Sequence, residues 1–353
     1  MRHPEIEEFV VDTGRLRTHV RAAGSEGAPA VLLLHGNVAS SRYYEGLMGA
    51  LSPAWRLVAP DLRGYGLSAV APVDATNGLG DFSQDVLSLV AALGLDEDNP
   101  LHVIGWSLGG GVAMQLAMDA PEKIASLTLL APMSPFGFGG TRSVDGRPHW
   151  EDFAGSGGGT ANPDLVARLA GGDRSAEAPT SPRAVMHALY VHSASAILAE
   201  DEEDYVDGML QTAIGDHNYP GDSRPSPNWP FVAPGTHGVV NAISPAYCNL
   251  AGFAEIGPRP PVLWIRGEDD MIVSDHSFSE LGHLGSLGLV PGWPGEEAYP
   301  AQPMVSQTRY VLDRYRQAGG TYREEVFASC GHSPHIEHPG EVAQLIQAFL
   351  RTS

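Results

Sequence analysis

The sequence predicts an α/β fold built on a mostly parallel, doubly wound sheet, and two features of its patterning lead to this prediction. Short, continuously apolar runs recur along the chain, at 30–34, 101–106 and 262–266. Segments with the apolar spacing of amphipathic helices separate these runs. Continuous apolar strands that alternate with helices are typical of a parallel sheet covered on both faces.

The remaining elements follow from the same patterns. Further strand-like runs occur at 9–11, 16–20, 56–59, 126–131 and 322–327. The clearest helix is expected over 81–93, where Asp81 is the predicted N-cap, Gln84 reaches back to complete a capping box, and Gly94 ends the helix. Other helical stripes begin after Ser107 and at 342.

The pattern changes in the middle of the chain. Between residues 135 and 250 glycine, proline and acidic residues prevail, and sheet-type runs return only at 262. We therefore expect a mainly helical insertion after the sixth strand, with the sheet domain formed by residues 1–134 and 251–353. The helical stretches expected within the insertion are 163–169, 182–198 and 203–214.

A second irregular stretch, residues 274–307, interrupts the C-terminal part of the predicted sheet domain. Loops of this length are usually functional lids or disordered segments. This one contains the sequence Pro291-Gly292-Trp293-Pro294-Gly295 and a tyrosine, a composition that favours an ordered loop.

Composition limits the possible partners and compartment. The 353 residues carry a formal net charge of −21, which repels nucleic acid and anionic membrane surfaces. No apolar run is long enough to cross a bilayer, and the first residues lack the apolar stretch of a signal peptide. Two cysteines, Cys248 and Cys330, are too few for a disulfide framework in this length of chain. We expect a cytoplasmic protein with neither a nucleic-acid nor a membrane partner.

The strongest local signal for chemistry is Gly105-Trp106-Ser107-Leu108-Gly109-Gly110, which lies between an apolar strand and an apolar helix. A nucleophile on such a turn needs glycines on both sides, because neighbouring backbone passes too close for a Cβ atom. The following helix N-terminus favours developing negative charge. The bare G-x-S-x-G pattern is weak in a chain with 42 glycines, but its position predicts that Ser107 is a nucleophile.

A serine nucleophile needs a base, and the base needs a partner that holds its tautomer. Carboxylates follow the strand at 262–266, in Gly267-Glu268-Asp269-Asp270, and His332 follows the strand at 322–327. Side chains at the carboxyl ends of parallel strands meet at one edge of the sheet. The order serine, acid, histidine matches that of one class of serine hydrolases.

In these residues and their order, the chain resembles the α/β-hydrolases that carry a cap domain. The likeness extends over both core segments and leaves the insertion and the 274–307 loop unmatched. It rests on five motifs in one order: His35-Gly36-Asn37, Asp61-Leu62-Arg63-Gly64-Tyr65-Gly66, Gly105-Trp106-Ser107-Leu108-Gly109-Gly110, Gly267-Glu268-Asp269-Asp270 and Gly331-His332. The resemblance implies a sheet of the α/β-hydrolase type, with residues 135–250 as the cap.

The resemblance also assigns roles to single residues. It favours Asp270 over Asp269 as the acid, because the family's aspartate usually sits three residues after the glycine that ends its strand. Some members take the acid after the preceding strand, but here residues 131–134 contain no carboxylate. The backbone amides of Asn37 and Leu108 are the implied oxyanion donors.

Other motifs receive structural interpretations. His35, Asp61 and Arg63 are expected to brace the loops beside the site. The spacing of His332, His335 and His338 could suggest a metal site, but Pro334 and Pro339 interrupt the helix that it would need. A minority of the insertion's aromatic residues are expected to line an apolar pocket over the nucleophile; the candidates are Phe136, Phe138, Trp150, Phe153, Tyr190, Tyr205, Trp229, Phe231 and Tyr247.

The functional hypothesis is hydrolysis of a carboxylic ester through an acyl-enzyme, with Ser107, His332 and Asp270 as the triad. The substrate is expected to be a small, apolar acyl compound, and the chemistry requires neither a cofactor nor a metal. The same triad could instead cleave a carbon–carbon bond of β-diketone type or a lactone. A ligand-binding receptor or pseudo-enzyme on this fold is the non-enzymatic alternative. No pattern in the sequence specifies the natural substrate or the oligomeric state.

Overall fold

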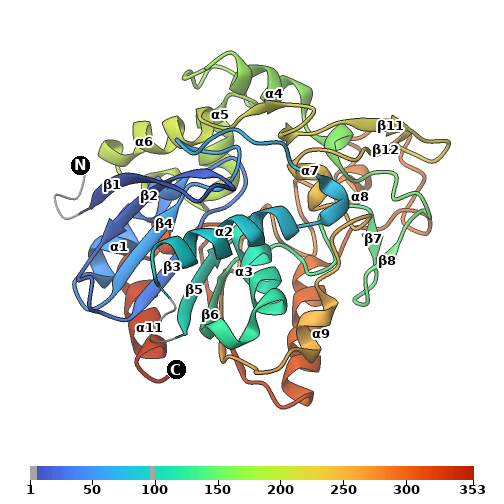
Figure 1. The fold of residues 1–353 in the computed structure, drawn as a ribbon. Coiled ribbons are helices and arrows are strands. Elements are labelled where there is room, and N and C mark those ends of the chain that lie inside the picture. Colours follow the sequence, from blue (N-terminus) through green and yellow to red (C-terminus); the bar gives the residue numbers. More distant parts are fainter. Residues whose placement is uncertain (1–5, 96–99) are drawn as a thin grey trace.

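A computed structural model describes residues 6–95 and 100–353 (Figure 1). Within these residues the core is an eight-stranded sheet with the order β1-β2-β4-β3-β5-β6-β13-β14. Its strands are β1 Glu7–Asp12, β2 Arg17–Ala23, β3 Ala30–Leu34, β4 Arg56–Pro60, β5 Leu101–Trp106, β6 Ile124–Leu130, β13 Val262–Gly267 and β14 Tyr322–Phe327. β1 and β2 pair antiparallel, as do β2 and β4, whereas all later neighbours pair in parallel. Residues 1–5 lie outside the description. They begin the N-terminal segment in which the sequence predicts no signal peptide.

The mostly parallel sheet confirms the predicted fold class. Every residue of β5 is buried, and four of the five residues of β3 are buried, as their continuous apolar sequences require. Helices cover both faces: α1 packs on α11, and α2 packs on α3 on the opposite face (Figure 1). The core helices are α1 Glu45–Leu51, α2 Gly80–Ala92, α3 Leu108–Asp119, α9 Met304–Gln317, α10 Pro334–Glu337 and α11 Pro339–Leu350.

The start of α2 differs from the prediction. The N-cap position is Leu79, and Asp81 lies in the first turn of the helix. The carboxylate of Asp81 is 3.3 Å from the Arg15 guanidinium and 3.5 Å from that of Arg63. Asp81 therefore contributes to ion pairs with distant residues, which local spacing did not reveal. At the other end of α2, Gly94 has φ of +60°, as expected for a helix stop.

The insertion lies between β6 and β13, beyond one end of the sheet (Figure 1). Its regular elements are α4 Pro163–Ala170, α5 Pro182–Val185, α6 Ala199–Leu210 and α7 Val239–Ala242, with short strands β7 Thr141–Arg142, β8 Arg147–Pro148, β9 Ile214–Gly215, β10 Tyr219–Pro220, β11 Ser223–Pro225 and β12 Val232–Pro234. Helices are its longer elements, but much of it is irregular. We call residues 135–250 the cap; these boundaries stay a prediction.

Two predicted cap helices have different bounds. The helix expected at 203–214 runs from 199 to 210. The one expected at 182–198 leaves its helical path after a π-helical turn, Met186–Tyr190. The backbone N–H of His192 donates to the Glu337 carboxylate rather than to a helix carbonyl. Beyond this turn the chain thus contacts the core instead of continuing the helix.

The segment 274–307 is not simply a loop, because it contains helix α8, Leu281–Ser286, and its last residues begin α9 at Met304. The Glu280 carboxylate caps α8 by accepting the N–H groups of Gly282 and His283 at 2.7 and 3.0 Å. The ring of Tyr299 stacks on His149 of the cap with a centroid distance of 3.8 Å. The two glycines within α8 obscured it in the sequence.

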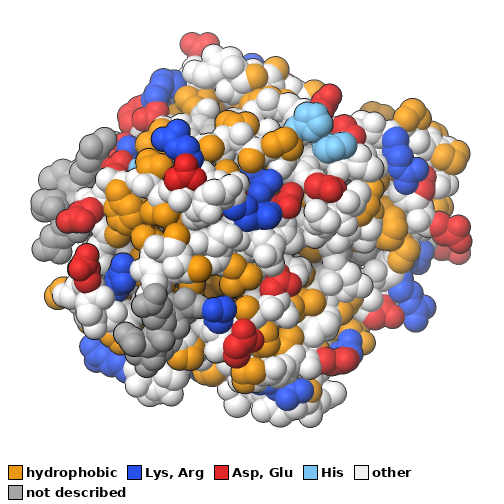
Figure 2. Space-filling view, viewed as in Figure 1, with side chains coloured by type: hydrophobic (Ala, Val, Ile, Leu, Met, Phe, Trp, Pro, Cys, Tyr) orange, Lys and Arg blue, Asp and Glu red, His pale blue; other side chains and the backbone are white. Residues whose placement is uncertain are grey.

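On the face shown in Figure 2, acidic and basic side chains lie side by side rather than in separate patches. Both cysteines are buried and free. No helix in the described ranges is both long enough and apolar enough to span a membrane.

Candidate active site

Ser107 lies on the turn between β5 and α3. Its backbone has φ of 56° and ψ of −116°, a conformation that is strained for any residue with a Cβ atom. A Cβ at Gly105 would lie 2.2 Å from the Gly109 carbonyl oxygen, and one at Gly109 would lie 1.9 Å from the Leu34 carbonyl oxygen. The two glycines are therefore required by packing, as the motif predicted.

Backbone hydrogen bonds on both sides hold this turn. The Ser107 N–H donates to the Leu130 carbonyl at 3.0 Å, and the Ser107 carbonyl accepts N–H groups from Gly110 at 3.0 Å and Met133 at 3.1 Å. Neighbouring strand ends thus fix a serine at the N-terminus of α3, where the helix dipole favours negative charge.

His332 and Asp270 meet at the same edge of the sheet. The distance from His332 Nδ1 to Asp270 Oδ2 is 2.8 Å, and each side chain is 2% exposed. The second oxygen of Asp270 accepts the N–H groups of Ile272 and Val273 at 2.8 and 2.9 Å. Asp269 instead lies 3.4 Å from His192 and is 45% exposed. Of the two aspartates, Asp270 is the one that contacts His332.

The loop that carries His332 is held by residues that the sequence did not single out. Trp106, the variable residue of the G-x-S-x-G motif, donates its Nε1–H to the His332 carbonyl at 2.8 Å. The Glu337 carboxylate accepts the N–H of Gly331 at 2.6 Å and that of His192 at 2.7 Å. Glu337 thereby joins the histidine loop to the cap, and no local pattern marks it.

Asn37 and Leu108 border the same cavity as Ser107 and His332. Within the described ranges, neither backbone N–H donates a hydrogen bond. Two tyrosines hold the Asn37 turn: Tyr65 donates to Asn37 Oδ1 at 2.6 Å, and Tyr190 of the cap donates to the carbonyls of Asn37 and Val38 at 3.2 and 3.1 Å. The two amides are thus fixed and available to a ligand.

Ser107 and His332 share the cavity but are not hydrogen-bonded to each other in this structure. Bonds between a nucleophile and its base often tighten only in the substrate complex. His35 lies behind the site, where its Nε2 accepts the Leu62 N–H at 2.9 Å and its Nδ1 faces the Gly36 carbonyl at 2.8 Å. Burial lowers the pKa of His35, so it is neutral and braces the two loops.

The other histidines of the 332–338 spacing diverge. His335 is buried against Trp106 with a ring-centroid distance of 5.1 Å, and burial lowers the pKa of His335 to about 3. His338 packs near Phe327 instead. The described part of the chain contains no group of three histidine, cysteine, aspartate or glutamate side chains arranged to hold a metal ion.

Asp61 is the centre of a buried polar network below the Asn37 loop. Its carboxylate accepts the N–H and the hydroxyl of Ser41 at 2.8 and 2.7 Å, and it lies 2.8 Å from His19 Nδ1. Burial alone would raise the pKa of Asp61, but the hydrogen bonds from His19, Leu67 and Ser41 hold the pKa well below its ordinary value. The ionised carboxylate therefore stabilises the fold.

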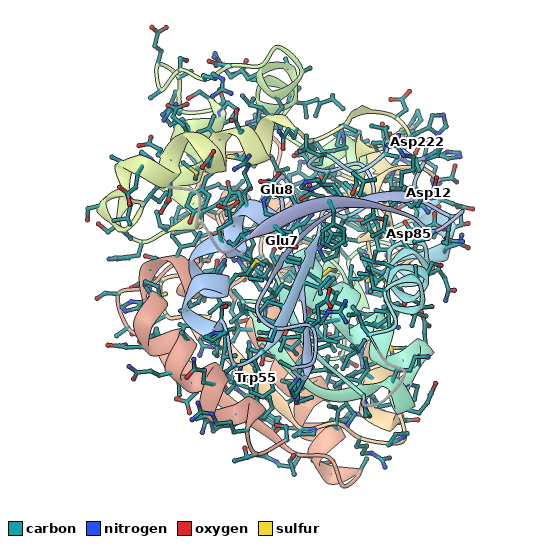
Figure 3. All side chains as sticks on the ribbon, turned by 60° about the vertical axis from the view of Figure 1, so that its left-hand side comes forward. Glu7, Glu8, Asp12, Trp55, Asp85 and Asp222 are labelled. Atoms are coloured by element: carbon teal, nitrogen blue, oxygen red, sulfur yellow. The ribbon has the colours of Figure 1, made fainter. Side chains whose placement is uncertain are left out.

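We expect Asp61→Asn to destabilise the protein by about 3 kcal/mol, measured by urea unfolding near pH 7, because it leaves buried donors with poorer partners. The lowered folded pKa means that the contribution is complete above about pH 4, the value for an unfolded aspartate, and is lost as pH falls below it. Glu7→Gln, at an exposed position of β1 (Figure 3), is the control. An unchanged unfolding free energy in Asp61→Asn contradicts the assignment.

Arg63 forms a second brace. Its guanidinium makes two bonds to the Asp85 carboxylate on α2, at 2.7 and 2.8 Å, and a third to the Pro72 carbonyl. Figure 3 places Asp85 on the opposite side of the sheet from α11. The bidentate pair ties the loop after β4 to the sheet-covering helix.

A cavity of about 660 Å³ covers Ser107. Residues of the core, the cap and the 274–307 segment all contribute to its walls, and among the described residues no aspartate, glutamate, lysine or arginine lines it. Apolar and aromatic contributors include Val38, Trp106, Leu108, Met133, Phe138, Leu165, Val185, Leu189, Tyr190, Met209, Tyr219, Val240, Ile243, Phe278, Leu281 and Leu284. Of the cap aromatics considered from sequence, Phe138 and Tyr190 line the cavity; Tyr219 also lines it and was not among them.

Comparisons with known proteins agree with this architecture. The profile of a family described by the alpha/beta hydrolase fold matches residues 29–295. Carboxylesterase YbfK of Bacillus subtilis (strain 168) is 31% identical over 132 residues, which cover 37% of this chain and 43% of that protein. Lipase LipV of Mycobacterium tuberculosis (strain ATCC 25618 / H37Rv) is 38% identical over 117 residues, covering 32% and 41%. The chain thus matches less than half the length of these relatives.

Solved structures resemble the chain over nearly its whole length. Serine hydrolase CCSP0084 from Cycloclasticus zankles has a TM-score of 0.62 at 18% identity, with 98% of both chains covered. Carboxylesterase CesB (YbfK) from Bacillus subtilis has a TM-score of 0.60 at 18% identity and covers 100% of this chain and 94% of its own. At such identities the likeness establishes the fold alone. Because the family profile extends over well more than half of the sequence, the chain belongs to the α/β-hydrolase fold family.

Proposed function

We propose that the protein is a serine hydrolase that cleaves a carboxylic ester through an acyl-enzyme. One observation carries the proposal: a serine on a strained strand–helix turn shares an apolar cavity with a histidine whose Nδ1 is 2.8 Å from a buried aspartate. This is the arrangement that activates serine for attack on a carbonyl. The esterase and lipase names of relatives with partial sequence matches agree with it.

The proposed reaction begins with attack by Ser107 Oγ on the ester carbonyl. Asp270 holds the proton of His332 on Nδ1, which leaves Nε2 free to accept the serine proton. The oxyanion accepts hydrogen bonds from the amides of Asn37 and Leu108. When the tetrahedral intermediate collapses, the bond to the alcohol oxygen breaks and His332 returns the proton to that oxygen.

The acyl-enzyme is then hydrolysed by the same groups. His332 accepts a proton from water, the resulting hydroxide attacks the acyl carbon, and the bond to Ser107 breaks as the serine recovers its proton. The products are one alcohol and one acid. No step requires a group beyond these side chains, the two backbone amides and water.

The test is modification by a fluorophosphonate, followed by intact-mass analysis and peptide mapping. We expect one adduct per chain, on the peptide that contains Ser107, and loss of turnover of p-nitrophenyl esters in step with labelling. Labelling at another residue, or none in the folded protein, would refute the mechanism. Product analysis separates ester cleavage from cleavage of a β-diketone, which gives a ketone and an acid.

A further inference from the structure

The cavity over Ser107 contains few free polar groups away from the reacting centre. Thr160 donates its hydroxyl to the Gly157 carbonyl, and Asn162 caps the N-terminus of α4. Thr180 donates its hydroxyl to the Asp164 carboxylate. The hydroxyl of Tyr190 is directed to the Asn37 loop, as described above. Thr160, Thr180 and Tyr190 thus use their hydroxyl protons within the protein. The side-chain NH₂ group of Asn162 and the hydroxyl of Ser279 have no partner among the described residues, but Asn162 is exposed and Ser279 is only half-buried.

Tyr219 is different. Its side chain lines the cavity and is only 7% exposed, yet its hydroxyl forms no hydrogen bond with any described residue. The hydroxyl oxygen is open to the cavity rather than enclosed by protein. Most buried tyrosine hydroxyls bond to the protein, whereas this one is accessible to whatever enters the cavity. An acceptor atom of a bound ligand can therefore take its hydrogen bond.

The backbone around Tyr219 is held firmly to the core. The Tyr219 N–H donates to the Ala213 carbonyl at 3.0 Å, and the Ala213 N–H donates to the Gly64 carbonyl at 2.8 Å. The side chain of Asn218 donates to the Ala71 carbonyl at 2.8 Å. Because these bonds join β10 to the loop after β4, the phenol is a preorganised donor rather than part of a mobile surface.

Tyr219 also lies on the Asn37 side of the cavity. Burial raises the pKa of Tyr65 and of Tyr190, and the nearby Tyr219 phenol adds to each increase. The other two hydroxyls bond to Asn37, whose amide is the proposed oxyanion donor. Burial raises the pKa of Tyr219 itself to about 12, so the phenol keeps its proton at neutral pH.

From this geometry we propose that the substrate is an uncharged ester with a second acceptor oxygen, such as an ether, and that Tyr219 donates a hydrogen bond to that oxygen. This inference rests on the proposed ester hydrolysis. Among the described residues, no aspartate, glutamate, lysine or arginine lines the cavity, so a substrate carboxylate buried there would lack an ionic partner. Tyr219 is thus a specificity-determining residue, separate from the triad.

The experiment compares kcat/KM for a set of p-nitrophenyl esters in the wild-type protein and in Tyr219→Phe. The set contains the hexanoate, its analogues with one methylene replaced by an ether oxygen at successive positions, and mono-p-nitrophenyl adipate, which carries a carboxylate. The ratio of wild-type to variant values for each ester cancels differences in intrinsic reactivity. We expect at least one ether analogue to lose about tenfold more than the hexanoate on removal of the hydroxyl.

Tyr205→Phe is the matched control, because Tyr205 is also a cap tyrosine with 7% exposure but does not line the cavity. For every ester, its kcat/KM should equal that of the wild-type protein. Equal losses for every ester in Tyr219→Phe, or no loss for any, would overturn the role of Tyr219. Turnover of the adipate half-ester as efficient as that of the hexanoate would overturn the uncharged class. Fluorophosphonate labelling of Ser107 in both variants shows separately whether the triad operates.

Discussion

Ser107→Ala should lower kcat/KM for a p-nitrophenyl ester by about 10⁴- to 10⁶-fold, because it removes the proposed nucleophile and leaves only binding and oxyanion stabilisation. The residual rate should resemble that of variants at His332, since members of a triad act as one unit. Steady-state kinetics and the loss of fluorophosphonate labelling provide the measurement.

Stability separates this result from misfolding. The Ser107 hydroxyl forms no hydrogen bond within the described ranges, and alanine adopts the strained φ of 56° no more easily than serine does. The unfolding free energy of Ser107→Ala should therefore stay within about 1 kcal/mol of the wild-type value in urea titrations. Activity close to that of the wild type, in a folded variant, would mean that another residue is the nucleophile.

Asp270→Asn should lower kcat by about 10³- to 10⁴-fold. Asp270 accepts hydrogen bonds at both oxygens, one from His332 and the other from the N–H groups of Ile272 and Val273. An asparagine must direct its NH₂ group toward one of these sets. If the NH₂ group faces His332, the imidazole loses the tautomer whose Nε2 accepts the serine proton. If the NH₂ group faces the backbone, it lies against the N–H donors of Ile272 and Val273.

Asp269→Asn provides the matched comparison. Asp269 is adjacent in sequence but about half exposed, and it contacts His192 rather than His332. We expect its kcat to change less than threefold, since an exposed ion pair contributes little. The reverse pattern, with Asp269→Asn inactive and Asp270→Asn active, would reassign the acid.

Much of the sheet could be predicted because its central strands are buried on both faces. Burial on both faces demands uninterrupted apolar residues, and the runs at 30–34 and 101–106 coincide with β3 and β5. Helix boundaries were predicted less well where distant groups compete with local ones. Asp81 pairs with two arginines, and the His192 N–H bonds to Glu337 where the sequence predicted a continuing helix.

In the candidate site, short motifs predicted the positions at which backbone geometry restricts the choice of residue. Gly105 and Gly109 mark the turn at Ser107 because no side chain fits there. The choice between Asp269 and Asp270 rested on family spacing, whereas the contact with His332 depends on how the loop after β13 turns back. The catalytic roles of Asp270 and His332 stay predictions, which the experiments above test.

The sequence by itself determined the fold class and pointed to the three candidate residues at strand ends, because each depends on local periodicity or on a turn with a strict steric requirement. Only the tertiary structure decided what surrounds them. The apolar cavity arises where the cap, the core and the 274–307 segment meet, and within the described ranges the Tyr219 hydroxyl that borders it has no partner. β10 owes its position to hydrogen bonds with residues far away in the chain. Such contacts leave no periodic signal, since each depends on the positions of segments that only the complete fold brings together.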